Sequence, residues 1–381
     1  MVPSIGKLQS ELMREYYRYF SKYAKGALPD RKVAWVTSFA PVEILEALDI
    51  LYYYPESYAA VIAASGKEQE FLEQSRALQL TCDCCSYSCC MEGCIEQMSG
   101  PRGTPPKPDI LIATNNQCST LPNWWNILAD RYKVPLVILD YPGETAQTDA
   151  SSYVTGQHRE LIRELEELSG NSLDLERLTS VITRSEQSVA AWKKVTCLMS
   201  TRQVNPTVLF DDINYLITAR CKEKTAELYT KMADEFKELP EALSDRVPVF
   251  WLGYPLWYHP DRYLSEIMDG FRISGSNYIA WWNLDYSGDD VFDQLYHAYN
   301  YTFLNLSQSS RNERLKQWID ESGAQCAVTL RNKSCKCDFV SARLLKLPQA
   351  ELQIDMIDRT FPDLERARRQ MEILKEIVCT K

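Results

Sequence analysis

The feature that most constrains the fold of this chain is a pattern that occurs twice. Residues 107–142 and residues 323–355 each begin with a short apolar run, reach a cysteine through polar residues, and continue into a helix-like stretch and a second apolar run. Such runs are typical of buried parallel strands. The pattern predicts two β–loop–α–β units whose cysteines, Cys118 and Cys335, follow the carboxyl end of a strand. Open α/β sheets bind their ligands at that edge.

Further apolar runs extend each unit into a larger sheet. We expect strands at Val33–Thr37 in the first half and at Val247–Leu252 and Tyr278–Trp282 in the second half. The predicted fold class is therefore α/β, with two doubly wound, Rossmann-like domains. Their parallel sheets should face each other across a central cleft.

The length of 381 residues also favours more than one domain. We predict an N-terminal α/β domain over residues 1–156, a helical segment over 157–245 and a C-terminal α/β domain over 246–381. The helical segment is indicated by QHRELIRELEELSG, where apolar residues recur at helical spacing and Gly170 is suited to a C-cap.

Cysteines are concentrated in one expected loop. Six of the chain's 13 cysteines lie between Cys82 and Cys94. The N-terminal residues lack the apolar core of a secretory signal, and no run approaches the roughly 18 apolar residues of a membrane span. We therefore expect a soluble, cytoplasmic protein, in which thiols stay reduced and clustered cysteines bind metal or carry out redox chemistry.

The spacing of the cysteines favours an iron–sulfur cluster over zinc. Cys82 and Cys85 form a CxxC pair without a matching second pair, and Cys335 and Cys337 are too close for the usual zinc knuckle. Single thiolates from separate loops suit a cubane cluster better, and a cluster with three thiolates keeps one iron open. A small buried side chain is the alternative interpretation of Cys118 and Cys335.

Four other cysteines are expected to be small buried side chains in the core rather than ligands. They are Cys197, Cys221, Cys326 and Cys379.

Several segments, in this order, resemble the iron–sulfur subunits of the 2-hydroxyacyl-CoA dehydratase and benzoyl-CoA reductase family. The resemblance covers nearly the whole chain, through QHRELIRELEEL to the C-terminal IDRTFPDLERARRQMEIL. Its main segments are PVEILEALDILYYYPESYAAVIAASG (41–66), CSYSCCMEG (85–93), NNQCSTLPNWW (115–125), VPLVILDYPGE (134–144) and RNKSCK (331–336).

The resemblance implies a [4Fe–4S] cluster held by Cys85, Cys118 and Cys335. It also implies an ATP-dependent iron–sulfur activator, a low-potential ferredoxin, a CoA thioester substrate and a similar second subunit. The Ser-Cys-Lys sequence around Cys335 favours a benzoyl-CoA reductase-like enzyme that transfers an electron from the cluster to the thioester. A 2-hydroxyacyl-CoA dehydratase subunit and a non-catalytic electron-relay subunit are the alternatives.

Surplus cysteines depart from the family pattern. Cys82, Cys89 and Cys337 lie close in sequence to the implied ligands. Some family members bind a double cubane, [8Fe–9S], which needs six thiolates. A homodimeric double-cubane protein that reduces small molecules is therefore a further alternative.

Other candidates for chemistry are few. The net charge of −10 without a basic block argues against a nucleic-acid or anionic-membrane surface. No phosphate-binding glycine motif is present, so ATP is expected on a partner. His259 follows an expected strand and is a weak candidate for a proton donor, and His158 is expected on the charged face of a helix. Asp140 and Asp355 end strands and are expected to cap the helices that follow.

Overall fold

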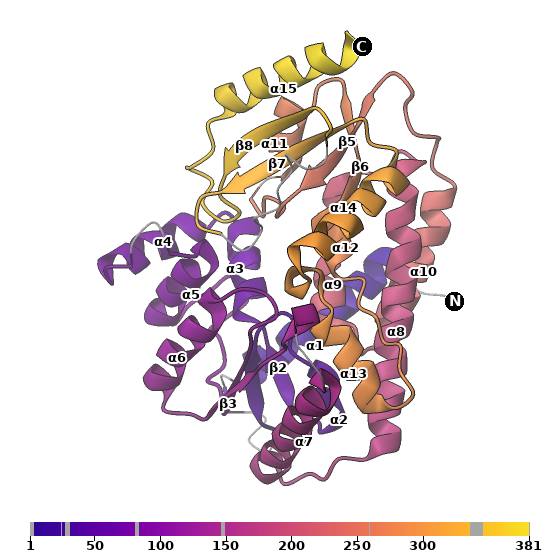
Figure 1. The fold of residues 1–381 in the computed structure, drawn as a ribbon. Coiled ribbons are helices and arrows are strands. Elements are labelled where there is room, and N and C mark those ends of the chain that lie inside the picture. Colours follow the sequence, from indigo (N-terminus) through magenta and orange to yellow (C-terminus); the bar gives the residue numbers. More distant parts are fainter. Residues whose placement is uncertain are drawn as a thin grey trace.

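Two four-stranded parallel sheets lie at the centre of the part of the chain that the computed structural model describes (Figure 1). That part comprises residues 4–23, 25–26, 31–80, 84–145, 149–258, 260–335 and 346–380. The first sheet, in the order β2-β1-β3-β4, contains β1 (Val33–Val36), β2 (Leu51–Tyr53), β3 (Ile110–Thr114) and β4 (Leu136–Leu139). The second, in the order β6-β5-β7-β8, contains β5 (Val247–Leu252), β6 (Phe271–Ser276), β7 (Cys326–Asn332) and β8 (Gln349–Ile354).

The two sheets have the same topology. Ala34 of β1 pairs with Tyr52 on one side and Ile110 on the other. Val249 of β5 likewise lies between β6 and Cys326 of β7. The internal repeat therefore corresponds to two equivalent parallel sheets, which confirms the predicted fold class.

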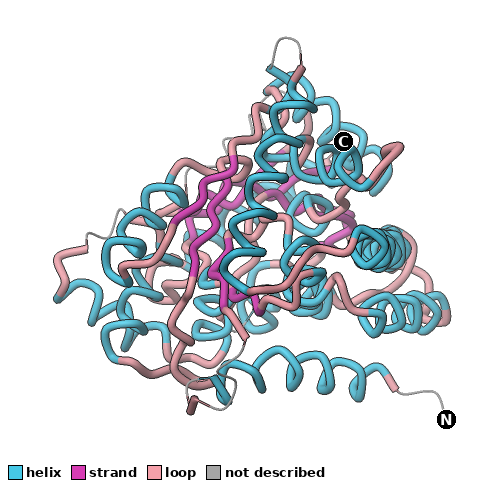
Figure 2. Tube along the Cα trace, turned by 90° about the horizontal axis from the view of Figure 1, so that it is seen from below, coloured by secondary structure: helices cyan, strands magenta, loops and turns pink. Residues whose placement is uncertain are grey.

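Burial explains why these sequences form strands. All four residues of β1 (VAWV) are buried, as expected for a parallel strand covered by helices on both faces. Figure 2 shows the strands enclosed by helices. The last strand, β8, alternates between buried and less buried positions because it lies at the edge of its sheet.

The helices of the N-terminal half lie before and between the strands of the first sheet in the chain. They are α1 (Ile5–Tyr23), α2 (Val42–Ala47), α3 (Pro55–Ala64), α4 (Glu68–Ala77), α5 (Ser86–Gln97) and α6 (Thr120–Tyr132), followed by the short η1 (Gly143–Thr145). Close packing of α4 on α5 requires Gly93, because a Cβ there would lie 2.0 Å from the carbonyl oxygen of Phe71.

Helices occupy most of residues 150–237, and the first of them begins before residue 157, where we expected the helical segment to start. They are α7 (Ala150–Ser169), α8 (Leu175–Cys197), η2 (Leu198–Ser200), α9 (Pro206–Ala219) and α10 (Glu223–Lys237). Gly170 ends α7 with φ of 74°, as its expected role of C-cap requires.

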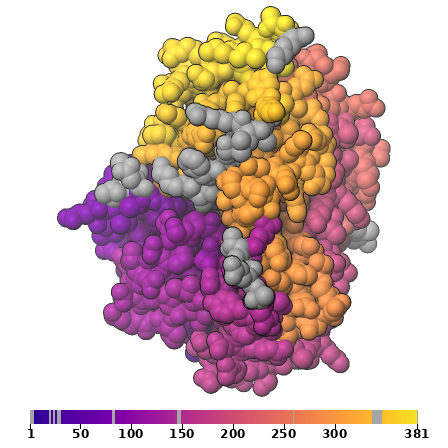
Figure 3. All heavy atoms as spheres, viewed as in Figure 1, coloured from indigo at the N-terminus to yellow at the C-terminus, as the bar shows by residue number. Residues whose placement is uncertain are grey.

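Helices of the C-terminal half include one that returns to the first half. They are α11 (Pro260–Ile267), α12 (Asn277–Trp281), α13 (Val291–Asn300), η3 (Phe303–Asn305), α14 (Gln308–Ser322) and α15 (Leu364–Cys379). The α13 helix packs against α7, and Figure 3 shows this orange part of the chain beside the magenta part. The two halves are therefore in direct contact.

A buried ion pair fixes the contact between these parts. Arg220, at the end of α9, donates from Nε to Glu43 of α2 at 3.0 Å, and both side chains are at most 1% exposed. Tyr286 and Tyr299 donate hydroxyl groups to the same carboxylate. Arg220 also donates to the carbonyl oxygen of Ala40, so this network holds the loop that follows β1.

Two local predictions are wrong. The expected strand at Tyr278–Trp282 is occupied by α12, and the strand of that unit is β6, directly before it. A short apolar run is compatible with either a strand or a buried helix. The expected cysteine-rich loop is largely α5, which begins at Ser86 and buries Cys89, Cys90 and Cys94.

Candidate active site

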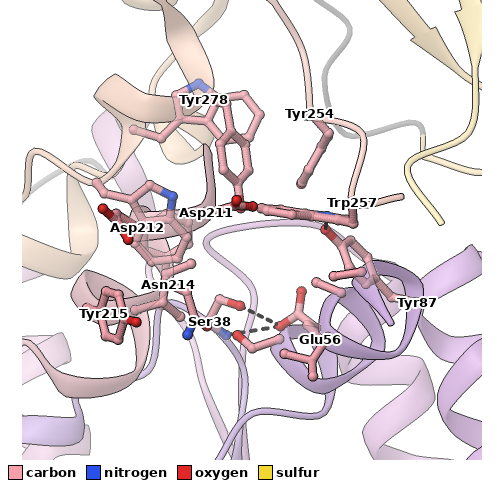
Figure 4. Close-up of a pocket in the computed structure, with 18 of the residues that line it drawn as sticks. Ser38, Glu56, Tyr87, Asp211, Asp212, Asn214, Tyr215, Tyr254, Trp257 and Tyr278 are labelled. Atoms are coloured by element: carbon pink, nitrogen blue, oxygen red, sulfur yellow. Dashed lines mark hydrogen bonds between the residues drawn. The ribbon is translucent and has the colours of Figure 1, made fainter. Parts of the chain in front are cut away.

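A pocket of about 470 Å³ lies where the carboxyl ends of strands from both sheets meet. Ser38 follows β1, Gln117 follows β3, and Trp257 and Tyr278 follow β5 and β6. Figure 4 shows side chains from both halves pointing into this space. The pocket therefore occupies the position that the sequence predicts for a ligand-binding cleft.

The segments of Cys85 and Cys118 contribute Tyr87 and Gln117 to this pocket, and the segment of Cys335 lies against that of Cys85. Cys85 is the N-cap residue of α5, and its thiol is close enough to that of Cys118 for the two to interact electrostatically. The backbone N–H of Ser86 donates to Oγ of Ser334 at 3.1 Å. Ser86 directly follows Cys85, and Ser334 directly precedes Cys335. This hydrogen bond therefore joins the segments of these two cysteines.

The aspartates at the ends of β4 and β8 support the two cysteine segments in equivalent ways. Asp355 accepts a hydrogen bond from Ser334, the residue before Cys335, at 2.9 Å. Asp140 accepts one from the side-chain amide of Asn115, three residues before Cys118. Asp355 also accepts the backbone N–H groups of residues 357 and 358 in the turn that follows β8. The expectation that Asp140 and Asp355 cap the next helices is wrong, because Asp149 is the N-cap residue of α7 and Asp363 that of α15.

Among the described residues, the groups that act most strongly on the Cys85 thiol include no positive charge that would stabilise a thiolate. Burial raises the pKa of the Cys85 thiol well above its ordinary range, and the nearby Cys118 and Glu56 raise it further. Across the described residues, no group of three or more His, Cys, Asp or Glu side chains is arranged to hold a metal ion. The role of the three cysteines as ligands stays a prediction.

Glu56 is a buried carboxyl group in the wall of the pocket. Its Oε2 accepts the backbone N–H and the hydroxyl of Ser38, both at 3.0 Å, and its Oε1 accepts the side-chain amide of Gln117 at 2.9 Å (Figure 4). None of these partners is charged. Burial therefore raises the pKa of Glu56 above its ordinary value, although the hydrogen bonds oppose the shift. Glu56 can hold a proton directly beside the Cys118 segment.

Aromatic side chains form the wall contributed by the second half. Trp257 donates its indole N–H to the hydroxyl of Tyr87, which joins the segment after β5 to α5. The rings of Tyr254 and Tyr278 lie 5.2 Å apart. Across the pocket, Figure 4 shows Asp212, where burial raises the pKa of its carboxyl to about 7. The lining therefore combines aromatic walls with buried carboxyl groups at both ends.

The sequence did not single out Glu56. The available signal was a glutamate directly after Pro55, at the first turn of a helix that follows a tyrosine-rich strand. That position places the carboxyl group at the edge of the sheet, but many surface helices begin in the same way.

The remaining residues that the sequence singled out are either placed differently from the prediction or lie outside the described residues. His158 was expected on the charged face of a helix, and this is wrong: it is fully buried, shares a hydrogen bond with Tyr141, and burial lowers its pKa to about 4. His259, Cys82 and Cys337 lie outside the described residues.

The remaining cysteines divide between core and surface. Cys89 is buried in α5 and lies against Cys84. Cys221 and Cys326 are buried, which confirms their assignment to the core. Cys197 and Cys379 are exposed, so that assignment is wrong for them.

Comparisons with known proteins agree on one family. A sequence profile described as 2-hydroxyglutaryl-CoA dehydratase, D-component, matches residues 37–377. Lactoyl-CoA dehydratase subunit alpha of Anaerotignum propionicum is 26% identical over 362 residues, 86% of each chain. The (R)-2-hydroxyisocaproyl-CoA dehydratase alpha subunit of Clostridioides difficile is 26% identical, over 90% of this chain and 84% of its own. A benzoyl-CoA reductase subunit of Thauera aromatica is 25% identical, over 91% of this chain and 89% of its own.

These matches confirm the expected family and the expectation of an enzyme. Because the family profile and two of these relatives are those of dehydratases, a dehydratase subunit fits better than the reductase-like function favoured by the Ser-Cys-Lys sequence. Among the described helices, none combines the length and apolar character needed to cross a membrane.

Proposed function

Because the chain belongs to the 2-hydroxyglutaryl-CoA dehydratase, D-component family, we propose that it is the iron–sulfur subunit of a 2-hydroxyacyl-CoA dehydratase. Such an enzyme removes water from carbons 2 and 3 of a CoA thioester. The observation that carries this proposal is Glu56, a carboxyl group with a raised pKa in a pocket beside the Cys85 and Cys118 segments.

The cofactor of the proposed enzyme is a [4Fe–4S] cluster, for which Cys85, Cys118 and Cys335 are the ligands. Thiols are suitable donors for such a cluster, and these three come from separate segments that lie near one another. The unassisted Cys85 thiol has a raised pKa, so a bound iron would provide the positive charge that a thiolate requires. When bound, the cluster supplies a low-potential electron and an iron with an open position that polarises a substrate oxygen.

Glu56 is the proton donor in this proposal. When the C2–O bond breaks, the departing hydroxyl needs one proton to leave as water, and a carboxyl group with a raised pKa can supply it. The resulting carboxylate can then take a proton from carbon 3, which restores Glu56. Ser38 and Gln117 hold the carboxyl group in place through this exchange.

The walls of the pocket assist by excluding water. Tyr87, Tyr254, Trp257 and Tyr278 are all buried. An apolar lining strengthens electrostatic interactions inside the site and protects reactive species from hydrolysis.

The names of two relatives support a partner subunit. Two relatives are alpha subunits of dehydratases, so we propose that this chain works with a second, similar subunit. An ATP-dependent activator and a low-potential ferredoxin would deliver the electron. A cytoplasmic location remains part of the same proposal.

Two other functions are each favoured by one observation. The likeness to the benzoyl-CoA reductase of Thauera aromatica supports a reductase that acts on an aromatic CoA thioester. The contact between Cys84 and Cys89, close to Cys85, supports a double cubane. Iron analysis separates the two clusters, because a single cubane contains about four irons per chain and a double cubane about eight.

The test of the proposal is an assay on the chain co-purified without oxygen together with its second subunit. Activator, ATP and a strong reductant are added to 2-hydroxyacyl-CoA thioesters, and the products are identified by mass spectrometry. The corresponding 2-enoyl-CoA supports a dehydratase. Two-electron reduction of benzoyl-CoA, with the hydroxyacyl substrates left unchanged, would support the reductase instead.

A further inference from the structure

Three arginines converge at the amino-terminal edge of the second sheet, opposite the candidate active site. Arg202, Arg246 and Arg272 all line two adjoining pockets of about 350 and 530 Å³. Arg272 is the second residue of β6, and Arg246 directly precedes β5. The six residues of β5 separate this edge from the candidate active site by roughly 20 Å, at about 3.3 Å per strand residue.

None of the three guanidinium groups forms an ion pair with a described residue, although the chain has a net charge of −10. Arg272 donates to the carbonyl oxygen of Ser200 at 3.2 Å, and Arg202 to that of Leu239 at 3.5 Å. Burial lowers the pKa of Arg272. The charges of Arg202 and Arg272 are thus held in place by backbone carbonyl groups, which orient a guanidinium but do not neutralise it.

Two buried donors at this site have no acceptor. The Nε atoms of Arg202 and Arg272 are inaccessible to solvent and lack a hydrogen-bond partner among the described residues. Leaving a buried charged donor unpaired is costly. An anionic ligand beside these guanidinium groups would offset that cost electrostatically.

Carboxylates are present at the edges of the site but do not cancel its charge. Glu241 lines one pocket and Asp261 the other. Asp261 accepts a hydrogen bond from Thr207. Three arginines therefore face two carboxylates, and neither carboxylate forms an ion pair with an arginine of the described residues.

We propose that Arg202, Arg246 and Arg272 form a binding site for a phosphate-bearing small molecule. Planar guanidinium groups with several donors match the oxygens of a phosphate group. Pockets of this size accommodate a nucleotide-sized ligand. Hydroxyl and amide side chains of Ser244 and Gln325 line the larger pocket and offer further donors.

Two sources share this chemistry. One is coenzyme A, whose pantetheine arm is comparable in length to the separation between this site and the candidate active site. The other is a free nucleotide or inorganic phosphate that binds independently of the substrate. The inference does not depend on the proposed dehydratase activity, because binding is measured without turnover.

Isothermal titration calorimetry on the full chain with its second subunit tests the proposal. Coenzyme A, ADP and inorganic phosphate are the probes, and pantetheine is the probe without phosphate. The charge reversal Arg246→Glu should weaken binding of the phosphate-bearing probes about tenfold or more, as loss of a charge-assisted contact predicts. Arg246 is exposed, so this change should leave the melting temperature nearly unchanged.

The matched control is Arg262→Glu. Arg262 is highly exposed on the neighbouring α11, pairs with Glu266 and does not line either pocket. This variant should bind every probe as the wild type does. A second test, Arg272→Gln, removes a partly buried guanidinium and should weaken the same probes.

Comparison of the probes identifies the source. Coenzyme A binding much more tightly than ADP would identify the substrate's own phosphates, and ADP or phosphate binding equally well would identify a separate ligand. The proposal is overturned if no phosphate-bearing probe binds, or if Arg246→Glu and Arg272→Gln bind these probes as tightly as the Arg262→Glu control.

Discussion

Gln117, the residue before Cys118, donates its side-chain amide to Oε1 of Glu56 at 2.9 Å. This hydrogen bond joins the segment that carries a predicted cluster ligand to the carboxyl group that we assign as proton donor. Both Gln117 and Glu56 line the pocket, so a ligand bound there would lie beside the two side chains.

Replacing Glu56 with Gln tests the proton donor. The change keeps the size of the side chain but removes its exchangeable proton, so we expect kcat to fall by about 10²- to 10⁴-fold. Iron content should stay unchanged. The matched control is Glu92→Gln, because Glu92 is also buried but accepts from Trp124 and pairs with Arg131 outside the pocket. If Glu56→Gln and Glu92→Gln were equally active, Glu56 would not be the proton donor.

The same variant has a defined effect on the pH dependence of stability. Burial raises the pKa of Glu56 above its ordinary value of 4.5, so the folded state binds this proton more tightly than the unfolded chain does. The stability from this group is present below the unfolded pKa and is lost as the pH rises through the folded pKa. Urea unfolding should show Glu56→Gln becoming more stable relative to the wild type as the pH rises above about 4.5. A difference that stays constant as the pH rises would contradict the raised pKa.

Loss of Cys118 tests the cluster ligands. Cys118→Ala should lose most of its iron and labile sulfide, because a cluster with two protein thiolates is poorly held. Cys197→Ala is the control, since Cys197 is exposed and does not line the pocket. The control should retain about four irons per chain. Full iron content in Cys118→Ala would show that other residues hold the cluster.

The buried pair of Arg220 and Glu43 should be important for stability. Arg220→Ala leaves the carboxylate of Glu43 buried without its cation, which typically costs about 3–5 kcal/mol. Lys222→Ala, which breaks the more exposed pair with Glu46, should cost about 1 kcal/mol or less. Chemical denaturation of both variants measures the difference. Similar values for the two would contradict the role of the Arg220 network.

His158 should make the fold sensitive to acid. Burial lowers its pKa to about 4, so its contribution to stability is present above the ordinary pKa of 6.5 and is lost as the pH falls through about 4. The shift corresponds to up to about 3 kcal/mol. His158→Gln keeps a hydrogen-bonding partner for Tyr141 and should lose less stability on acidification than the wild type does, as followed by urea denaturation. An equal loss would contradict this assignment.

Much of the fold could be predicted from the sequence, because continuous apolar runs mark parallel strands that are buried on both faces. The runs at Val33, Ile110, Val247 and Cys326 all belong to strands of the two sheets. The β6 strand could not be identified in this way, because FRISGS mixes polar and small residues. The adjacent aromatic run that begins at Tyr278 is buried equally well by a helix.

The candidate site could be predicted only in part. Cys118 and Cys335 were recognisable because the repeat places them after strands, and Asp140 and Asp355 mark the same repeat. Glu56 could not be singled out, since its raised pKa arises from burial and from neutral partners that tertiary contacts bring together. The arginines around Arg272 are likewise far apart in sequence and meet only in the folded chain.

The most direct test of the central claim is a turnover measurement on the oxygen-free complex with activator, ATP and reductant. The wild type should convert a 2-hydroxyacyl-CoA to its 2-enoyl-CoA, and Cys118→Ala and Glu56→Gln should each lose most of that activity, the first with its iron and the second without iron loss. A wild-type complex that carries its cluster and accepts electrons from the activator, but leaves every 2-hydroxyacyl-CoA unchanged, would contradict the account.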